Sequence, residues 1–248
     1  MQSRTVSAAN GWNWIRDGFR LFMQSPAIWI ALFLIYLLIG GVLSVIPLLG
    51  PIVLHLLAPV FIAGFMLGCR ALENEQELEI NHLFAGFKQN TSQLVTVGGI
   101  YLAGIILIAG VIFMASGGAV LSALTVNSHD VERASAAAAA AGGGVMLVAL
   151  IGLAALIPLM MAYWFAPILV VFHDLTAADA MKTSFNACLN NILPFTVYSL
   201  VAAVLIILAA IPFGIGLVVL IPTMMASLYA SYKDVFNPPP VAGGEIAM

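Results

Sequence analysis

Six long apolar stretches constrain the fold of this sequence more than any other feature. They cover residues 27–46, 51–69, 94–124, 143–172, 192–211 and 213–231. A helix needs about 20 apolar residues to cross the hydrocarbon core of a bilayer. A strand of a membrane barrel would instead alternate polar and apolar side chains over about 10 residues. The pattern therefore predicts an all-α integral membrane protein with six transmembrane helices, of which the longer third and fourth tilt or project from the membrane.

The composition favours a protein whose surface faces lipid. Hydrophobic residues make up 62% of the 248 positions and charged residues only 8%, whereas a soluble domain carries about 25% charged residues. The net charge of −3, without any basic run, argues against a nucleic-acid partner. Arg16, Asp17 and Arg20 interrupt the N-terminal segment. A cleaved signal peptide is therefore not expected, and the first crossing is predicted to remain as an anchor.

Basic residues predict which ends of the crossings face the cytoplasm. With six crossings, seven of the eight Lys and Arg residues fall on one side, and only Arg133 falls on the other. The seven are Arg4, Arg16, Arg20, Arg70, Lys88, Lys182 and Lys233. Since basic loops stay on the cytoplasmic side, both termini are predicted to be cytoplasmic and residues 127–144 to form the main outer segment. Cys69 and Cys188 then lie near the inner side, where thiols stay reduced and free.

An amphipathic pattern interrupts the apolar sequence between the fourth and fifth crossings. Four apolar residues share one helical face and four polar residues the opposite face: Met181, Phe185, Cys188 and Ile192; Asp179, Lys182, Asn186 and Asn190. This period of 3.6 residues predicts an interfacial helix that leads into the next crossing. Thr176 and Asp179 have the spacing of a capping box at its start.

Comparable apolar stripes precede the first and third crossings. Their positions are Trp12, Ile15, Phe19 and Phe22 before the first, and Ile80, Leu83, Phe84, Phe87 and Leu94 before the third, with Asn81 as the expected cap. The three stripes contain the similar triplets "GFR" at 18–20, "GFK" at 86–88 and "SFN" at 184–186. Phe19, Phe87 and Phe185 are therefore predicted to be equivalent residues, each buried where an interfacial helix meets its crossing.

These matches, together with Pro59, Pro167 and Pro222 near the far end of each hairpin, predict three parallel hairpin repeats. Each repeat consists of a cytoplasmic amphipathic interfacial helix followed by two crossings. The repeats cover approximately residues 10–70, 80–174 and 176–236 of a single polytopic membrane domain, 1–237, and residues 238–248 are expected to form a disordered tail. The alternative is that the stripes are ordinary amphipathic connectors and that the short matches arose by chance.

Turn-forming residues mark the outer ends of the predicted hairpins. "IPLLGP" at 46–51 and "IPFGIG" at 211–216 combine Pro and Gly, which end a helix and reverse the chain. In the middle hairpin, the Ala run of "ERASAAAAAAGGG" favours a helix, and its three glycines are expected to break that helix. The alternative is that this segment extends a long crossing into the periplasm. Four tryptophans are predicted to anchor helices at the membrane interface. They are Trp12, Trp14, Trp29 and Trp164.

Few polar residues are placed where they could form a site. His55 falls inside the second crossing, where ionisable groups are functional candidates, although a neutral, hydrogen-bonded imidazole is the favoured interpretation. Weaker candidates for a polar site are His82, His173 and Asp174 near the inner side. With the two cysteines they could form a zinc site. No paired Cys or His spacing supports such a site, so no metal, cofactor or catalytic residue is predicted.

The most charged segment is "ENEQELE" at residues 73–79, between the second and third crossings. Its alternating carboxylates are Glu73, Glu75, Glu77 and Glu79. Carboxylates can hold a divalent cation, but nothing nearby supplies the glycine turn of a calcium loop. A solvated linker is therefore the favoured interpretation.

Most of the chain, apart from residues 127–144, resembles a known family. The resemblance lies in "GWNWIRDGFRLFMQSPAIW", "IPLLGP", "APILVVFHD", "AMKTSFNACLNNILPFTVYSL" and "GLVVLIPTMMASLYASYKDVF". These stretches resemble an uncharacterised proteobacterial family of six-transmembrane-helix inner-membrane proteins. They are also similar, more loosely, to the membrane domain attached to some glycerophosphodiester phosphodiesterases. The resemblance implies six crossings in a bacterial inner (plasma) membrane, and it implies no activity or site.

The sequence contains no nucleophile elbow, zinc-protease or phosphate-binding motif. It therefore predicts a non-enzymatic protein that organises membrane lipid or a partner membrane protein at the cytoplasmic leaflet. The alternative is a small transporter or channel for a lipid-like or weakly polar solute, although no carboxylate lies inside a crossing to couple ions. A membrane enzyme would need a convergent polar cluster, for which His82, His173 and Asp174 are the only starting point.

Overall fold

The computed structural model describes residues 3–124 and 131–236, and all the regular structure in these two ranges is helical. The elements are α1 (Asn10–Gln24), α2 (Pro26–Ser44), α3 (Leu49–Glu73), the 3-10 helix η1 (Ile80–Lys88), α4 (Thr91–Leu124), α5 (Val131–Trp164), α6 (Ala166–His173), α7 (Ala177–Asn190), α8 (Ile192–Ala210) and α9 (Leu217–Phe236). The predicted all-α class is confirmed. The predicted tail, 238–248, lies outside the described residues.

Five helical spans in the described ranges are long and apolar enough to cross a membrane. They are Pro26–Ser44, Leu49–Glu73, Thr91–Gly117, Gly142–His173 and Ile192–Ala210. The sixth predicted crossing, 213–231, is not among them. Its first apolar residues belong to the turn before α9, and α9 itself ends in a polar half that includes Ser227, Ser231 and Lys233.

Both predicted tight turns are present. Residues 45–48 join α2 to α3, and residues 211–216 join α8 to α9. Leu48, Phe213 and Gly214 adopt positive φ in these turns. The predicted break at the three glycines is wrong, because α5 continues through residues 142–144. A run of good helix formers on each side outweighs the modest helix cost of glycine.

The fourth predicted crossing is divided into two helices. α5 ends at Trp164, and α6 begins at Ala166 with Pro167 in its first turn. Proline has no N–H to continue the helical ladder and is tolerated in a first turn. Ser184 of α7 replaces the lost backbone bonds, since its hydroxyl accepts from the Phe165 amide at 2.9 Å and donates to the Met161 carbonyl at 2.6 Å.

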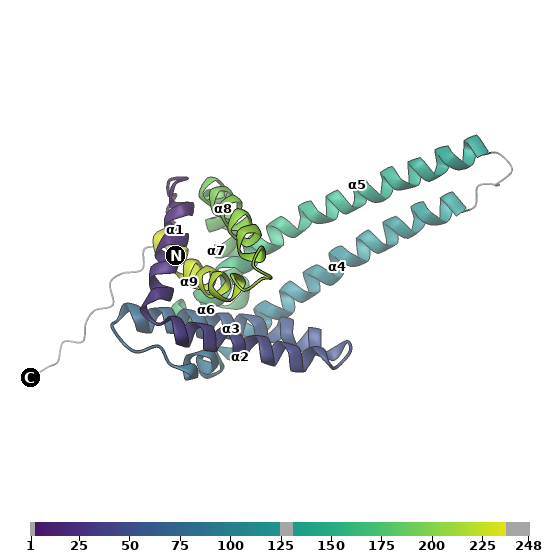
Figure 1. Cartoon of the computed structure of the whole chain (residues 1–248). Helices are drawn as coiled ribbons and strands as arrows, with labels where there is room; N and C mark the ends of the chain where they lie inside the picture. The colour runs from purple at the N-terminus through teal and green to yellow at the C-terminus, as the bar shows by residue number, and fades with distance from the viewer. Residues whose placement is uncertain (1–2, 125–130, 237–248) are drawn as a thin grey trace, which may run out of the picture.

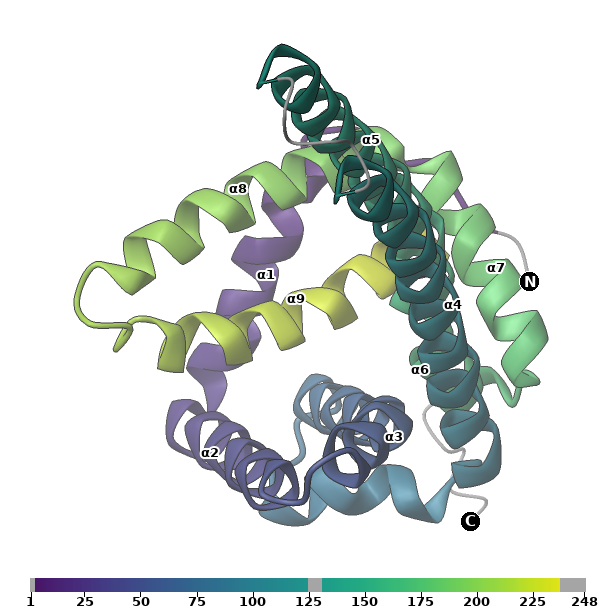
Figure 2. The same cartoon turned by 90° about the vertical axis from the view of Figure 1, so that its right-hand side faces the viewer.

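The hairpins diverge from one crowded region and do not form a single compact bundle. In Figure 1 the α4–α5 hairpin projects far from the remaining helices. α2 and α3 lie across that view but are seen end-on in Figure 2, whereas α8 and α9 lie across Figure 2. We call the α4–α5 hairpin the arm. We call the crowded region the packed end; it comprises α1, η1, α6, α7 and the adjoining ends of α3 and α9.

Three helix pairs carry the packed end, and each involves a small residue. α1 lies on α9, where a Cβ at Gly18 would come within 2.5 Å of the Ser227 backbone nitrogen. η1 lies on α3, where a Cβ at Gly86 would come within 2.1 Å of the Val60 carbonyl oxygen. α7 lies on α5, where Ser184 makes the two bonds described above. Small residues allow this close approach of helices.

Two further predictions, the interfacial position of the tryptophans and the cap of η1, differ from the structure. Trp14 and Trp29 are buried in the core, with 2% and 0% exposed, so they are not interfacial anchors. The predicted cap Asn81 is also wrong. Glu79 caps η1, with the His82 side chain completing the capping box. The predicted cap at the start of α7 is confirmed at Thr176, whose hydroxyl accepts from the Asp179 amide at 3.3 Å, while the Asp179 carboxylate accepts from that hydroxyl at 2.7 Å.

Cys69 and Cys188 are both buried free thiols, which confirms that part of the prediction. Burial raises the pKa of the Cys188 thiol to about 12, although its hydrogen bond with Ser184 acts in the opposite direction. Because the thiolate is the reactive form, this cysteine is expected to react slowly at neutral pH.

Candidate functional site: a polar cavity at the packed end

The buried face of α1 differs from the predicted stripe. Its buried residues are Gly11, Trp14, Ile15, Gly18 and Phe22, which repeat at helical spacing and lie against α8 and α9. The helix is thus rotated so that its smallest residues meet the backbone of neighbouring helices. The opposite side of α1 carries polar residues that face a cavity.

Asp234, near the end of α9, holds the N-terminal segment in place. Its carboxylate accepts hydrogen bonds from the Asn10 amide at 2.6 Å and from the Trp14 indole at 2.8 Å, and it pairs with Arg4. The Arg4 backbone N–H donates to the Val235 carbonyl at 2.9 Å. The first and last described segments of the chain therefore lie side by side.

Asn191 completes the attachment of the N-terminal segment at the α7–α8 junction. Its side-chain oxygen accepts from the Val6 amide at 2.9 Å, and its side-chain nitrogen donates to the Arg4 and Ala187 carbonyls at 3.0 and 2.9 Å. Asn191 is fully buried with all these bonds made. It is therefore a structural residue of the packed end.

Glu73 joins the ends of α3 and α9. Its carboxylate accepts from the Tyr229 hydroxyl at 2.6 Å and pairs with Lys233. Glu73 is therefore not part of a freely solvated linker, contrary to the prediction for the acidic run. Glu79 is also committed, since it caps η1. Glu75 and Glu77 have no partner among the described residues.

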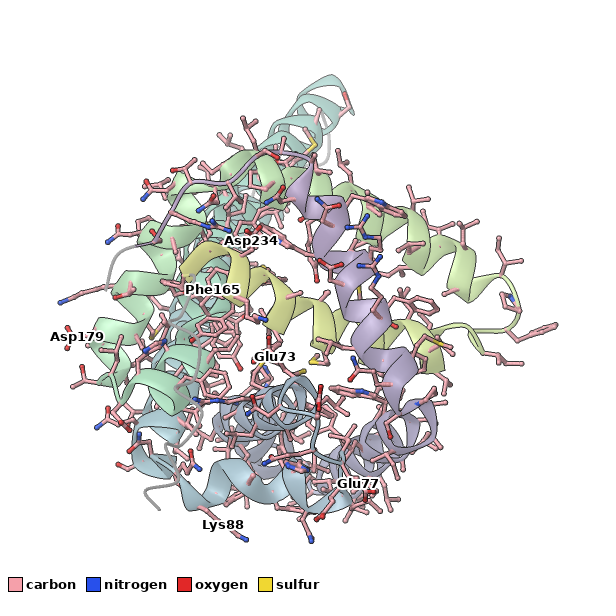
Figure 3. All side chains as sticks on the ribbon, turned by 90° about the vertical axis from the view of Figure 1, so that its left-hand side faces the viewer. Glu73, Glu77, Lys88, Phe165, Asp179 and Asp234 are labelled. Carbon is pink, nitrogen blue, oxygen red and sulfur yellow. The ribbon has the colours of Figure 1, made fainter. Side chains whose placement is uncertain are left out.

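A cavity of about 1280 Å³ opens between α1, the end of α3, the linker before η1 and the last turns of α9. Its basic lining residues are Arg16, Arg20 and Lys233. Its acidic lining residues are Asp17, Glu73, Glu75, Glu77 and Asp234. Figure 3 views this side of the molecule, with Glu73, Glu77 and Asp234 labelled. The charged residues are spread along the chain, so only the fold brings them together.

The apolar part of the lining comes from the same elements. Trp14 and Leu21 contribute from α1, Ile28 from the first turn of α2, Leu72 from α3 and Leu78 from the linker. α2 and α3 are two of the membrane-capable helices. The cavity therefore combines a charged interior with a side that reaches the start of the apolar helices.

The predicted polar candidates lie at separate places. His55 is exposed and its Nδ1 lies 2.8 Å from the Pro51 carbonyl oxygen, four residues earlier. This contact fits the hydrogen-bonded part of the favoured interpretation. The His82 side chain accepts a hydrogen bond from the Glu79 backbone N–H as part of the capping box of η1. Asp174 ends α6 in a left-handed conformation, and its carboxylate accepts from the Asn90 amide at 2.6 Å.

His173 is the candidate that comes nearest to a cluster. Its Nε2 lies 2.7 Å from the Tyr232 hydroxyl. The Arg70 guanidinium lies over the ring of the neighbouring Phe172, 4.9 Å from the ring centroid. These residues bring the ends of α3, α6 and α9 together. Among the side chains that the structure describes, no three from His, Cys, Asp or Glu gather closely enough to hold a metal ion.

The predicted interfacial anchors are not buried by protein. Trp12, Phe19 and Phe87 are 51%, 45% and 39% exposed, and Phe185 is half-buried. Protein therefore leaves these rings partly or largely uncovered, and their equivalence at the membrane interface stays a prediction. The adjacent small residues, Gly18, Gly86 and Ser184, occupy the buried positions, and the Phe87 ring lies edge-on to Phe61 of α3, 5.5 Å between centroids.

Sequence reasoning missed the cavity because its residues carry no recognisable spacing. Tyr229 and Asp234 follow the apolar part of α9 and had no assigned role. Tyr229 and Lys233 are four residues apart on α9, and this helical spacing is a signal that could have indicated a shared surface.

The fold defines an all-helical membrane protein, with five membrane-capable helices that converge at a polar end. A probable inner membrane protein of Burkholderia thailandensis is 31% identical over 234 residues, which cover 93% of this chain and 84% of that protein. The chain belongs to the same family as this protein. No family model and no solved structure matches the chain. The looser similarity to the phosphodiesterase membrane domain stays a prediction.

Proposed function

We propose that this protein is a non-enzymatic inner-membrane protein that organises lipid at the leaflet where α1, η1 and α7 lie. The observation that carries the proposal is how little protein covers the apolar helices. Only 17% of the most apolar window of α2 is buried, and the corresponding values are 11% for α4 and 17% for α8. Lipid is the component that covers such faces in a membrane, so the diverging hairpins hold lipid between them.

The exposed aromatic residues support the same role for the connecting helices. Trp12 and Phe19 on α1, and Phe87 on η1, are exposed beside charged residues of the same helices. A helix with aromatic and charged sides lies in the headgroup layer. We therefore propose α1 and η1, together with α7, as interfacial helices that fix the positions of nearby lipids.

The proposed topology has six crossings in three repeats, with α9 as the sixth. The pairing of Arg4 with Asp234 supports an even number, since the first and last described residues then share one side. The three helix pairs of the packed end support the repeats. Each proposed interfacial helix lies on the second helix of another hairpin, α1 on α9, η1 on α3 and α7 on α5.

Cysteine labelling in spheroplasts tests the topology. Ser128→Cys is expected to react with an impermeant maleimide, and Gln2→Cys is expected to be protected until the membrane is opened. Labelling of Gln2→Cys with protection of Ser128→Cys would reverse the proposed orientation.

Electron spin resonance of spin-labelled phospholipid tests the lipid role in vesicles that contain the purified protein. We expect a motionally restricted lipid fraction that falls on Phe19→Asp or Phe87→Asp and persists on Phe19→Leu or Phe87→Leu. A restricted fraction that is absent from the wild type, or unchanged by both Asp substitutions, would contradict the proposal.

The polar cavity favours transport of a weakly polar solute as the second candidate. Vesicles that contain the protein would then release an entrapped amphiphilic solute faster than protein-free vesicles. Equal release rates for such solutes would leave lipid organisation as the better account.

A further inference from the structure

The charges in the cavity are unevenly paired. Asp17 lies 3.6 Å from Arg16 and 3.2 Å from Arg20, so two guanidinium groups share one carboxylate. Glu73 pairs with Lys233, and Asp234 pairs with Arg4. One positive charge on α1 therefore remains in excess. The linker contributes two carboxylates, Glu75 and Glu77, without a partner among the described residues.

A ligand that complements this arrangement carries both a negative and a positive group. A phosphate matches guanidinium groups, which donate several hydrogen bonds in a fixed geometry. A primary ammonium matches the carboxylates of Glu75 and Glu77 and donates three hydrogen bonds. Arg16 and Arg20 are 48% and 68% exposed, and ion pairs of such exposed residues are weak. A phosphate can therefore replace the Asp17 carboxylate as the partner of the two guanidinium groups at little cost in free energy.

The shape of the cavity indicates that the ligand also has an apolar part. The volume of about 1280 Å³ is larger than a small polar headgroup occupies. Ile28 and Leu72 line it from the ends of two membrane-capable helices. A phospholipid placed here would keep its glycerol and the first part of its chains against these residues.

We propose that the cavity binds a zwitterionic phospholipid whose headgroup pairs a phosphate with a primary ammonium. Arg16 and Arg20 hold the phosphate, and Glu75 and Glu77 hold the ammonium. The proposal rests on the lipid-organising function and adds to it a selective site for one headgroup. It requires no chemical change in the lipid.

Native mass spectrometry of the full chain with added lipids tests the headgroup preference. The probes are phosphatidylethanolamine, phosphatidylcholine and phosphatidylglycerol with identical acyl chains. We expect retention of phosphatidylethanolamine over the other two, because choline has no N–H donor and glycerol has no positive charge. Equal retention of the three lipids would overturn the proposal.

Two variants and a matched control assign the effect to the cavity. The double substitution Glu75→Gln with Glu77→Gln is expected to reduce the preference roughly tenfold, as for the loss of one charge-assisted hydrogen bond. Arg16→Gln with Arg20→Gln is expected to weaken retention of all three lipids. Glu79→Gln changes a carboxylate of the same linker outside the cavity, where glutamine can still accept the capping bond, and it should leave the preference unchanged. A preference that survives the Glu75 and Glu77 double substitution overturns the assignment.

Two further readouts separate the possible failures. Free glycerophosphoethanolamine should not displace the bound lipid at equal concentration, and efficient displacement would overturn the lipid assignment in favour of a soluble zwitterion. The spin-label measurement reports all restricted lipid, whatever its headgroup. Restricted lipid without any headgroup preference would overturn this inference and leave the proposed function intact. If neither restricted lipid nor a headgroup preference is found, both the inference and the proposed function are overturned.

Discussion

The arm and the packed end have similarly apolar helices but differ in what covers them. α3 enters the packed end, whereas the spans Thr91–Gly117 and Gly142–His173 lie largely in the arm, the second continuing into α6. The three have mean hydropathies of 2.3, 2.4 and 2.6. In their most apolar windows, the buried share is 50% for α3, 11% for Thr91–Gly117 and 6% for Gly142–His173. Hydropathy thus indicates that a helix avoids water. It does not distinguish a helix that contacts protein from one that contacts lipid.

The difference between the two regions lies in small and polar residues. In the packed end, Gly18 and Gly86 admit a neighbouring backbone, and Ser184 bonds to one. In the arm, a Cβ at Gly110 would meet nothing within 4 Å. Since lipid is as apolar as leucine, helices in a membrane associate through close packing and hydrogen bonds. The arm keeps such packing at Gly98, against the α3 backbone, and at Gly104, against Leu159 of α5, and Gly110 lies where it is absent.

Truncation of a phenylalanine should separate the two regions most clearly. Phe61 of α3 is 3% exposed and lies edge-on to Phe87, 5.5 Å between centroids, whereas Phe113 of α4 is 80% exposed. Phe61→Ala should lower the free energy of unfolding by about 3 kcal/mol, because it leaves a cavity between packed side chains. Phe113→Ala should cost less than about 1 kcal/mol, because lipid or detergent fills the space. Equal losses, measured by denaturant unfolding in micelles, would remove the distinction.

Adding one methyl group tests close approach in the same two regions. Gly18→Ala should lower the free energy of unfolding by about 2 kcal/mol, since its Cβ would overlap the Ser227 backbone. Gly110→Ala should leave stability unchanged or raise it by up to about 1 kcal/mol through helix propensity. The thermal midpoint in detergent measures both. A tolerated alanine at position 18 would show that the α1–α9 contact is looser than described.

Asp234→Ala tests how far the packed end depends on buried polar groups. The substitution leaves the Trp14 indole N–H without its acceptor and should cost about 2 kcal/mol. Asp17→Ala, which removes an exposed carboxylate, should cost less than about 1 kcal/mol. Denaturant unfolding of the two variants makes the comparison, and a larger effect at Asp17 would contradict it.

Maleimide labelling of thiols is the comparison for which we expect the smallest effect, because the native Cys188 of the wild type should hardly react. The pKa of Cys188 is raised by burial, so the thiolate fraction at pH 7.5 is far below that of a free cysteine, and labelling should accelerate as the pH rises. Gly142→Cys, at an exposed position of the arm without neighbours, should be labelled by maleimide in detergent at pH 7.5. Cys188 should react only after unfolding. Rapid labelling of native Cys188 would show that α7 separates from the packed end.

Much of the fold could be predicted from particular residues. The apolar stretches predicted five spans that the helices match, the Pro and Gly residues at 46–51 and 211–216 predicted the turns, and Thr176 predicted the start of α7. These features are local, because helix length, turn conformation and capping depend on residues close together in the chain. The cap of η1 was predicted wrongly because Glu79 with His82 is an uncommon capping pair.

The candidate site could not be predicted in the same way. The carboxylate of Asp234 meets Arg4, Asn10 and Trp14 across more than 200 positions of sequence. Ion pairs of this kind depend on the direction of each helix, and nothing local specifies that direction. The rotation of α1 was likewise decided by Gly11 and Gly18, which a hydrophobic pattern does not distinguish from other weakly polar positions.

The sequence by itself determined that this protein is helical, that its helices belong in an apolar environment and where most of them begin and end, because these properties follow from composition and short-range spacing. Only the tertiary structure decided which apolar faces meet protein and which remain for lipid. It also decided which charges share the cavity. The physical reason is that helix contacts in an apolar environment depend on shape and hydrogen bonding between distant residues, whereas hydrophobicity is the same on every side.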